Sequence, residues 1–270
     1  MTYRLIAMDL DGTLKNDEKV ITKKTAACLM ELQRSGVRLV LASARPSPGL
    51  LAESTFLQLP EHDGILMSYN GGRIVEAGTG STLYETAMPL DMARNVLKKL
   101  EEYPVTVILD DGKQFYVTDP DGYKVGYECW NNNMSCTKVE NLAAFIDFEP
   151  VKFLMSVQPD ELSSVQKQIA SWLPPELTIV QTAPFYLEII PAVINKGEGL
   201  RQICSLLDIP LEETIAFGDS ENDIPMLRVA GIGVAMGNST QDVLEMADAV
   251  TDSNNEDGIA VFLNRLKEEA

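Results

Sequence analysis

Short, nearly uninterrupted apolar runs alternate with helix-like segments at both ends of this 270-residue chain. Residues 4–8, 37–42 and 65–69 form three such runs, and a segment that we expect to be a helix capped by Thr22 separates the first two. Strands of a parallel sheet have this pattern because helices cover both of its faces. The same alternation resumes at residue 197. The pattern therefore predicts an α/β fold with a Rossmann-like parallel-sheet core.

The middle of the chain has a different pattern. Residues 105–109 and 114–117 flank an Asp-Asp-Gly turn, which is a strong hairpin signal. Residues 131–150 are rich in Asn, lack periodicity and are expected to form a loop. Strands joined by hairpins and short loops predict an inserted α+β domain on an antiparallel sheet. The predicted domains are residues 1–86 with 190–270, which form the discontinuous core, and residues 87–189, which form the inserted domain.

Composition excludes several classes of function. The chain has 22 basic and 40 acidic residues, a net charge of −18, so it lacks the cationic surface that nucleic acids and anionic membranes require. The single histidine, His62, rules out a His-rich zinc site. Four cysteines without a C-x-x-C pair, and no signal-like segment, predict reduced thiols and a cytoplasmic protein. Carboxylates, hydroxyls and lysines remain as the candidate chemical groups.

Acidic residues directly follow two of the predicted strands. Asp9 and Asp11 come after the first strand, and Asp219 comes after the strand at residues 214–217. The carboxyl ends of parallel strands lie at one edge of a sheet, where ligands bind. Carboxylates gathered there raise one another's pKa; a divalent cation relieves their repulsion, and such oxygen ligands suit Mg²⁺. The alternative interpretation is an ordinary turn at Asp11-Gly12 and a helix cap at Asp9.

Two further residues at strand-to-helix junctions favour an anion. The hydroxyl of Ser43 and the backbone N–H that follows it are suited to bind a phosphate oxygen, and Lys196 precedes a predicted helix. Taken alone, Ser43 also fits a helix N-cap or a turn, and Lys196 also fits a solvated surface charge. Arg45 is expected either to reach a substrate or to pair with a surface acid. The prediction of an anion site depends on all these segments meeting at one edge of one sheet.

Together, these segments resemble the haloacid dehalogenase superfamily of aspartyl-phosphate enzymes. The four motifs of that superfamily are matched in order by Asp9-x-Asp11-Gly12-Thr13, Ser43, Lys196 and Gly218-Asp219-x-x-Asn222-Asp223. The sequence is similar to the Cof-type phosphatases, which have a large α/β cap, in Asn70-Gly71-Gly72, Leu187-Glu188-Ile189, Asn195-Lys196-Gly197 and residues 255–260. Ala44 departs from the pattern, since many members have Gly before the Arg.

The resemblance implies Mg²⁺-dependent hydrolysis of small phosphomonoesters, with sugar phosphates as the substrate class. Asp9 would be the nucleophile that forms an aspartyl-phosphate, and Asp11 would be the general acid and then the general base. The implied metal contacts are Asp9, Asp219 and the backbone carbonyl of Asp11, with Asp223 orienting Lys196 or a metal-bound water. The implied phosphoryl-binding groups are the backbone amides of Leu10 and Ala44 together with Ser43, Lys196 and Asn222.

Two alternatives remain open at this point, and a third, a dehalogenase, is less favoured because carbon–halogen displacement does not need the arrangement of Asp9, Asp11 and Mg²⁺. A phosphomutase uses the same intermediate but returns the phosphoryl group to a second hydroxyl. A non-catalytic protein that binds a phosphorylated metabolite would not need both Asp9 and Asp11. We expect a small phosphorylated metabolite as the partner, no nucleic acid and no membrane, and a monomer or a weak homodimer. The aromatic residues of the inserted domain are expected in its core, and His62 in a loop.

Overall fold

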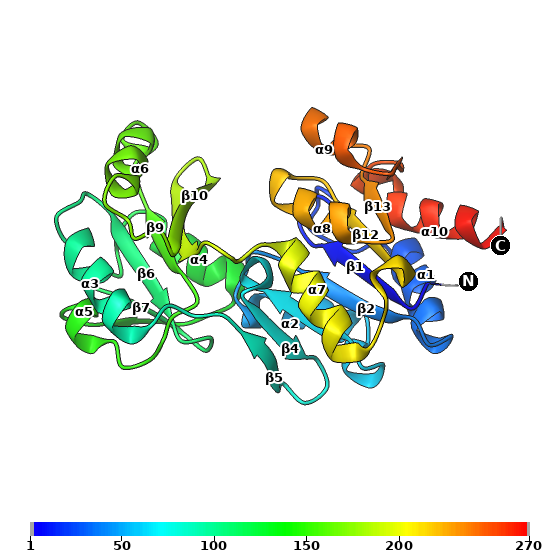
Figure 1. Cartoon of the computed structure of the whole chain (residues 1–270), viewed down its shortest axis with the longest axis horizontal. Helices are drawn as coiled ribbons and strands as arrows, with labels where there is room; N and C mark the ends of the chain where they lie inside the picture. The colour runs from blue at the N-terminus through cyan, green and yellow to red at the C-terminus, as the bar shows by residue number, and fades with distance from the viewer. Residues whose placement is uncertain (1–2, 269–270) are drawn as a thin grey trace. The chain divides into compact units, whose positions relative to one another are not determined.

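The computed structural model describes residues 3–268 and divides the chain into two compact units. One unit combines Met1–Glu85 with Asn195–Ala270, and the other is Thr86–Ile194. Strand β11 (Tyr186–Pro191) extends past residue 189, where the inserted domain was expected to end. Figure 1 shows the elements of each unit.

An eight-stranded sheet forms the centre of the first unit, with the order β14-β13-β12-β1-β2-β3-β4-β5. The first six strands of that order are parallel to their neighbours, whereas β4 and β5 form an antiparallel edge that the sequence analysis did not predict. The strands are β1 (Leu5–Asp9), β2 (Arg38–Ala42), β3 (Ile65–Ser68), β4 (Arg73–Glu76), β5 (Thr82–Glu85), β12 (Thr214–Gly218), β13 (Ile232–Ala235) and β14 (Ala249–Val250).

Helices cover both faces of this sheet, as Figure 1 shows. Ile6 and Met8 of β1 lie in the same apolar cluster as residues of α1 and α10, whereas Leu5 and Ala7 lie with residues of α7 and α8. Burial on both faces explains why the strand sequences are apolar without alternation. The helices are α1 (Lys23–Arg34), α2 (Leu51–Phe56), α7 (Lys196–Leu207), α8 (Ile224–Val229), α9 (Gln241–Met246) and α10 (Gly258–Glu268).

Short 3₁₀ turns connect several of these elements. They are η1 (Ser47–Leu50), η2 (Leu59–Glu61), η3 (Tyr69–Gly71), η4 (Leu211–Glu213), η5 (Glu221–Asp223) and η6 (Asn254–Glu256). The predicted cap of α1 is confirmed, because the Thr22 hydroxyl accepts a hydrogen bond from the N–H of Thr25 at 3.1 Å. His62 follows η2 in a connecting segment, as expected.

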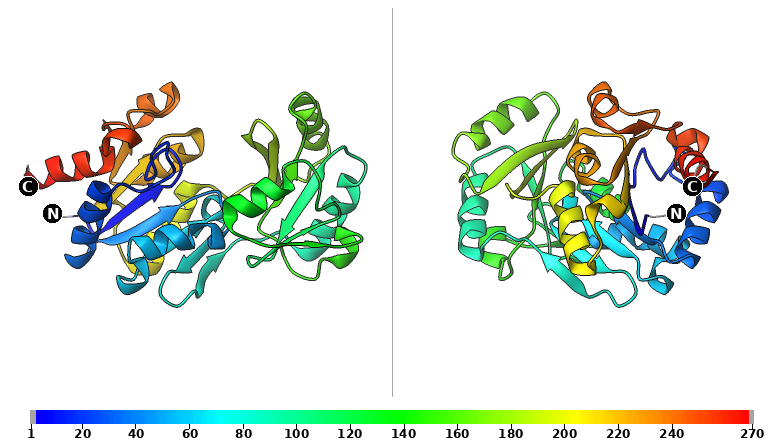
Figure 2. Two further views of the ribbon diagram at one scale, coloured as in Figure 1. Left: turned by 180° about the vertical axis from the view of Figure 1, so that it is seen from behind. Right: turned by 45° about the vertical axis from the view of Figure 1, so that its right-hand side comes forward.

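The second unit is built on a six-stranded sheet with the order β10-β11-β9-β6-β7-β8, seen from two sides in Figure 2. Every neighbouring pair is antiparallel except β7 and β8. The remaining strands are β6 (Thr106–Asp110), β7 (Phe115–Val117), β8 (Cys136–Lys138), β9 (Phe153–Ser156) and β10 (Leu177–Ala183). The predicted fold class is therefore confirmed: a mostly parallel core sheet and a second, mostly antiparallel sheet.

Four helices accompany this sheet: α3 (Leu90–Leu100), α4 (Val125–Asn132), α5 (Leu142–Phe145) and α6 (Leu162–Ala170). Helices α3, α5 and α6 pack on one face with Phe153 and Met155, whereas α4 lies on the other face with Leu154. None of the helices within residues 3–268 is long and apolar enough to cross a membrane.

Two expectations for the second unit were wrong. Residues 131–150 are not one loop, because they contain β8 and α5. The side chain of Asn141 caps α5, and Leu142 and Ala143 are buried in the same cluster as residues of α3. A helix of one turn is too short to show a helical periodicity in the sequence, so this tertiary contact was not predicted. The aromatic residues are not all core, since Trp130 is 77% exposed and Tyr127 is 44% exposed.

A buried ion pair lies within the second unit. The ammonium of Lys152 donates a hydrogen bond to the Glu188 carboxylate at 2.6 Å, and both side chains are almost completely buried. Burial alone would lower the pKa of Lys152, but Glu188 and then Glu128 offset burial and raise the pKa. Glu188 is the acidic residue of the Leu187-Glu188-Ile189 segment. Because it pairs with Lys152, its role in this structure is to neutralise a buried lysine.

Replacing Lys152 by Met should destabilise the second unit by about 3–5 kcal/mol, because the buried Glu188 carboxylate would lose its cation. Both tryptophans, Trp130 and Trp172, lie in this unit, so urea unfolding followed by tryptophan fluorescence reports on it. Lys98→Met, at an exposed position of α3, is the matched control and should change the free energy of unfolding by no more than about 0.5 kcal/mol. Equal effects of the two variants would contradict this role of the ion pair.

Candidate active site

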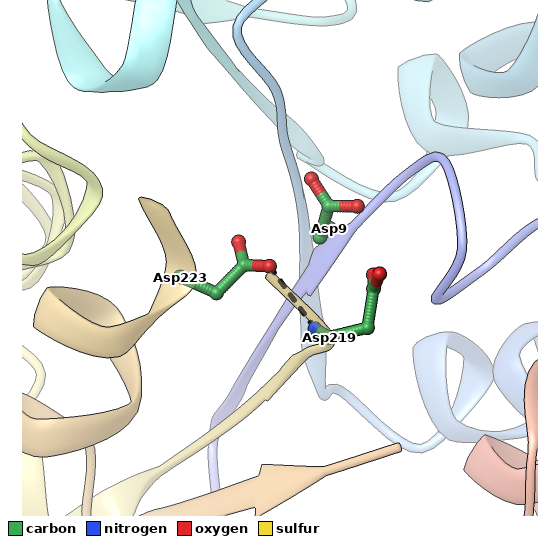
Figure 3. Close-up of side chains that lie close together, drawn as sticks. All are labelled: Asp9, Asp219 and Asp223. Atoms are coloured by element: carbon green, nitrogen blue, oxygen red, sulfur yellow. Dashed lines mark hydrogen bonds between the residues drawn. The ribbon is translucent and has the colours of Figure 1, made fainter. Parts of the chain in front are cut away.

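Two neighbouring strands deliver acidic residues to one place. Strand β1 ends at Asp9, and β12, which pairs with it in parallel register, is followed by Asp219. The turn η5 then brings Asp223 beside them. One carboxylate oxygen from each of these three residues lies within 4.8 Å of the others. Figure 3 shows the three side chains rising from neighbouring segments toward a common space.

Two hydroxyls and one glycine set the position of Asp219. The Thr13 hydroxyl donates to one carboxylate oxygen of Asp219 at 2.6 Å, and the Ser220 hydroxyl donates to the other at 3.0 Å. Gly12 has a φ of +92°, and a Cβ at this position would lie 2.6 Å from Asp219 Oδ2. Only glycine therefore allows the chain after Asp11 to approach this close. Neither Thr13 nor Ser220 was predicted to have a role, although Thr13 lies inside the first motif.

Lys196 joins two of the three carboxylates. Its ammonium lies 2.5 Å from Asp9 Oδ1 and 2.6 Å from Asp223 Oδ1, and the side chain is completely buried. The other oxygen of Asp223 accepts the backbone N–H groups of Asp219 and Ser220, both at 3.0 Å. Asp223 thus contacts Lys196 and also lies within the carboxylate group itself, and its orienting role stays a prediction.

The local start of α7 places Lys196. The Asn195 side chain caps this helix by accepting the N–H of Glu198 at 2.9 Å, and Lys196 is the first helical residue. The Asn195-Lys196-Gly197 segment is thus a capping unit that directs the lysine toward the ends of β1 and β12.

The electrostatics of the group favour a cation. Burial raises the pKa of Asp9 to about 8, against the opposing effect of Lys196 and with a further contribution from Asp223. Burial also raises the pKa of Asp219. Burial alone would lower the pKa of Lys196, but Asp223 and Asp9 offset burial and raise it. Because one lysine faces three carboxylates, the set fits a divalent cation with oxygen ligands.

The Asp11 side chain lies apart from this group. Its Oδ2 accepts hydrogen bonds from Nε and Nη2 of Arg45 at 2.9 and 2.7 Å, and the ammonium of Lys19 lies 3.6 Å from its Oδ1. Arg45 therefore pairs with Asp11 of the first motif, and not with a surface acid, which was one of the two outcomes expected for it. The metal contact attributed to Asp11 by resemblance involves its backbone carbonyl, and this contact stays a prediction.

The predicted phosphoryl-binding residues lie at the ends of the same strands. Leu10 follows β1, and Ser43 and Ala44 follow β2. The Ser43 oxygen accepts the N–H of Arg45 at 3.2 Å, so its own hydrogen remains able to donate to a phosphate oxygen. The Asn222 amide donates to Asn70 Oδ1 at 3.1 Å. Asn70 lies in the Asn70-Gly71-Gly72 segment, and its sequence pattern alone indicated no role for its side chain.

A divalent cation should bind within the carboxylate group, with Asp9 and Asp219 as its expected side-chain ligands, and stabilise the folded protein. Free Mg²⁺ at about a hundred times its Kd would add about 2.7 kcal/mol, which thermal unfolding with and without Mg²⁺ measures. Asp219→Asn should remove most of this stabilisation, whereas Asp242→Asn, at an exposed position of α9, should leave it unchanged. An unchanged Mg²⁺ effect in Asp219→Asn would contradict the site.

Comparisons with known proteins agree with this arrangement. The sequence model of the haloacid dehalogenase-like hydrolases matches residues 6–263. The 5-amino-6-(5-phospho-D-ribitylamino)uracil phosphatase YitU of Bacillus subtilis is 30% identical over 263 residues, which cover 96% of each chain. A crystal structure of a haloacid dehalogenase-like hydrolase from Bacteroides thetaiotaomicron matches with a TM-score of 0.92 and 31% identity, over 98% of this chain and 99% of that one.

A solved sugar phosphatase of subclass IIB of the same superfamily matches with a TM-score of 0.79 and 26% identity, over 98% of this chain and 99% of that one. The sequence match, the fold and the acidic strand ends all indicate the same family. The chain therefore belongs to the haloacid dehalogenase-like hydrolases, as a phosphatase of their Cof-type subclass IIB.

Proposed function

We propose that this protein hydrolyses small phosphomonoesters, with sugar phosphates as its substrate class, through a phosphoryl group carried on Asp9. One observation supports this proposal above the others. The Asp9 carboxylate, at the end of a buried strand, lies beside Asp219 and Asp223 and is held by a completely buried lysine. A purely structural ion pair would not need the third carboxylate, that of Asp219, beside the two that contact Lys196.

Mg²⁺ is the cofactor that we propose for this site. The donors are carboxylate oxygens, which suit a hard divalent cation, and the predicted contacts are Asp9, Asp219 and the backbone carbonyl of Asp11. When bound, Mg²⁺ would neutralise negative charge between the carboxylates and a phosphate dianion. Asp223 would orient the site through Lys196.

Asp9 is the proposed nucleophile. One of its carboxylate oxygens would form a bond to phosphorus while the bond between phosphorus and the ester oxygen breaks, leaving an aspartyl-phosphate. Lys196, which already lies against Asp9 Oδ1, would compensate the charge of the phosphoryl oxygens. The transition state of phosphoryl transfer is loose, so positioning and charge compensation supply most of the acceleration.

Asp11 is the proposed general acid and base. Its protonated carboxyl would give a proton to the departing alkoxide, and the resulting carboxylate would then take a proton from the water that attacks the aspartyl-phosphate. The backbone amides of Leu10 and Ala44, the Ser43 hydroxyl and the Asn222 amide would donate hydrogen bonds to the phosphoryl oxygens.

Purified protein with Mg²⁺ should release inorganic phosphate from members of a panel of phosphorylated sugars, nucleotides and cofactors, and EDTA should abolish this release. Asp9→Asn should lower kcat to background, because an amide cannot form the aspartyl-phosphate. Asp11→Asn should lower kcat by about 10²–10⁴-fold for sugar phosphates. A colorimetric phosphate assay measures each rate.

Asp91→Asn, at an exposed position of α3, is the control and should keep the wild-type rate. Wild-type rates in either active-site variant would contradict the assigned roles. An isomerised sugar phosphate without phosphate release would instead identify a phosphomutase. Binding of phosphate esters without turnover would identify a non-catalytic binding protein.

A further inference from the structure

Arg45 holds only one of the two carboxylate oxygens of Asp11. Its Nε and Nη2 both donate to Oδ2, at 2.9 and 2.7 Å. Hydrogen bonds from a guanidinium to a carboxylate are charge-assisted and directional, because the planar group fixes where its N–H groups point. The Arg45 side chain is 15% exposed, so this contact is partly shielded from water.

The other carboxylate oxygen, Asp11 Oδ1, has a different environment. Within the described part of the chain this atom is buried and has no hydrogen-bond partner. The ammonium of Lys19 is 3.6 Å away, too far for a hydrogen bond, and its side chain is 66% exposed. Two N–H groups already occupy lone pairs of Oδ2, so a proton on this carboxyl group belongs on Oδ1.

The backbone that carries Arg45 is held by an unusual segment. Tyr69 donates its N–H to the carbonyl of Arg45 at 3.0 Å, and Asn70 donates its N–H to the carbonyl of Ser43 at 2.9 Å. Tyr69 and Asn70 both have positive φ, +52° and +55°, which is rare for residues other than glycine. Strained backbone of this kind persists where the surroundings require it, often at functional sites. Here its effect is to fix the loop of residues 43–45 relative to Asp11.

We infer that Arg45 is a positioning residue for the proposed general acid, and that it reserves Asp11 Oδ1 for proton transfer. This inference rests on the proposed function. In the first step a carboxylate oxygen of Asp9 bonds to phosphorus as the bond between phosphorus and the ester oxygen breaks; the electrons of the broken bond stay on the ester oxygen, which takes the proton of Asp11 Oδ1–H. In the second step Oδ1 takes a proton from water while the water oxygen bonds to phosphorus and the Asp9–phosphorus bond breaks. Arg45 forms no covalent bond in either step.

This role predicts a dependence on the leaving group that other roles of Arg45 do not share. An alkoxide needs a proton to depart, whereas p-nitrophenolate departs without one near neutral pH. A residue that binds the phosphoryl group, or one that only supports the fold, would affect both kinds of ester by the same factor. The value of kcat/KM reports the step in which the leaving group departs, and it is insensitive to the later hydrolysis of the aspartyl-phosphate.

The experiment compares kcat/KM for p-nitrophenyl phosphate with that for the alkyl phosphate that the wild-type protein cleaves best. In Arg45→Gln the ratio of the two values should rise by about 10-fold or more, since general acid catalysis contributes about 10²–10⁴-fold. Arg45→Lys keeps the charge but cannot place two fixed donors on one oxygen, so its ratio should lie between those of the wild type and Arg45→Gln. Thermal unfolding checks that each variant is folded.

A double variant distinguishes positioning from independent effects. If Arg45 acts through Asp11, then Asp11→Asn with Arg45→Gln should have the same ratio as Asp11→Asn alone. Arg38→Gln is the matched control, because Arg38 lies at the other end of β2 in a surface pair with Asp63, 3.5 Å apart, and should not change the ratio.

Two outcomes would overturn the inference while leaving the proposed function intact. One is an equal loss on both esters in Arg45→Gln, and the other is multiplication of the two effects in the double variant. Failure of the proposed function is distinguishable from both, since it would be seen in the wild-type protein as no phosphate release from any ester with Mg²⁺, and it would remove this inference as well.

Discussion

The buried ammonium of Lys196 is the constraint on which the first unit's site depends. A charge with no exposure to water needs close partners of opposite sign, and Asp9 and Asp223 supply them. These three residues come from the end of β1, the start of α7 and the turn after β12, so one cation ties three segments together. The same contacts hold the nucleophile candidate in place and leave the carboxylate group with excess negative charge. The contacts of Lys196 thus stabilise the fold of the site but do not balance all of its negative charge. A divalent cation would neutralise the charge that remains.

The two aspartates of the first motif have separate environments although only Leu10 stands between them. Asp9 lies in the buried carboxylate group, and Asp11 lies against Arg45 and Lys19. Gly12 turns the chain directly afterwards, beside Asp219. This separation suits two different tasks, because a nucleophile needs charge compensation at its attacking oxygen, whereas a general acid needs one oxygen that is able to hold a proton. The Asp219 carboxylate is held in place by hydrogen bonds from the hydroxyls of Thr13 and Ser220 rather than by a cationic side chain.

The second unit also contains a buried lysine, and there the lysine pairs with a buried glutamate. Lys152 and Glu188 form a buried pair in a sheet whose two faces are covered by apolar clusters. The pair explains the acidic residue within an otherwise apolar strand sequence, Leu187-Glu188-Ile189, which strand periodicity alone does not account for. Lys152 immediately precedes β9, and β11 pairs with β9 in antiparallel register, so the two charges meet across neighbouring strands. The pairing of Lys152 with Glu188 could not be predicted from the sequence, because the two residues are 36 positions apart and no local pattern connects them.

By itself, the sequence determined the fold class and the residues that end the core strands, because unbroken apolar runs and the acids that follow them are local properties of the chain. It did not reveal the antiparallel edge of β4 and β5, the short helix at Leu142–Phe145 or the exposure of Trp130, which depend on packing rather than on periodicity. Only the tertiary structure decided which side chains are partners: Lys196 meets Asp9 across 187 positions, and Arg45 reaches Asp11 rather than a surface acid. A hydrogen bond depends on separations of about 3 Å, and strand register and helix packing set those separations between segments that are remote along the chain.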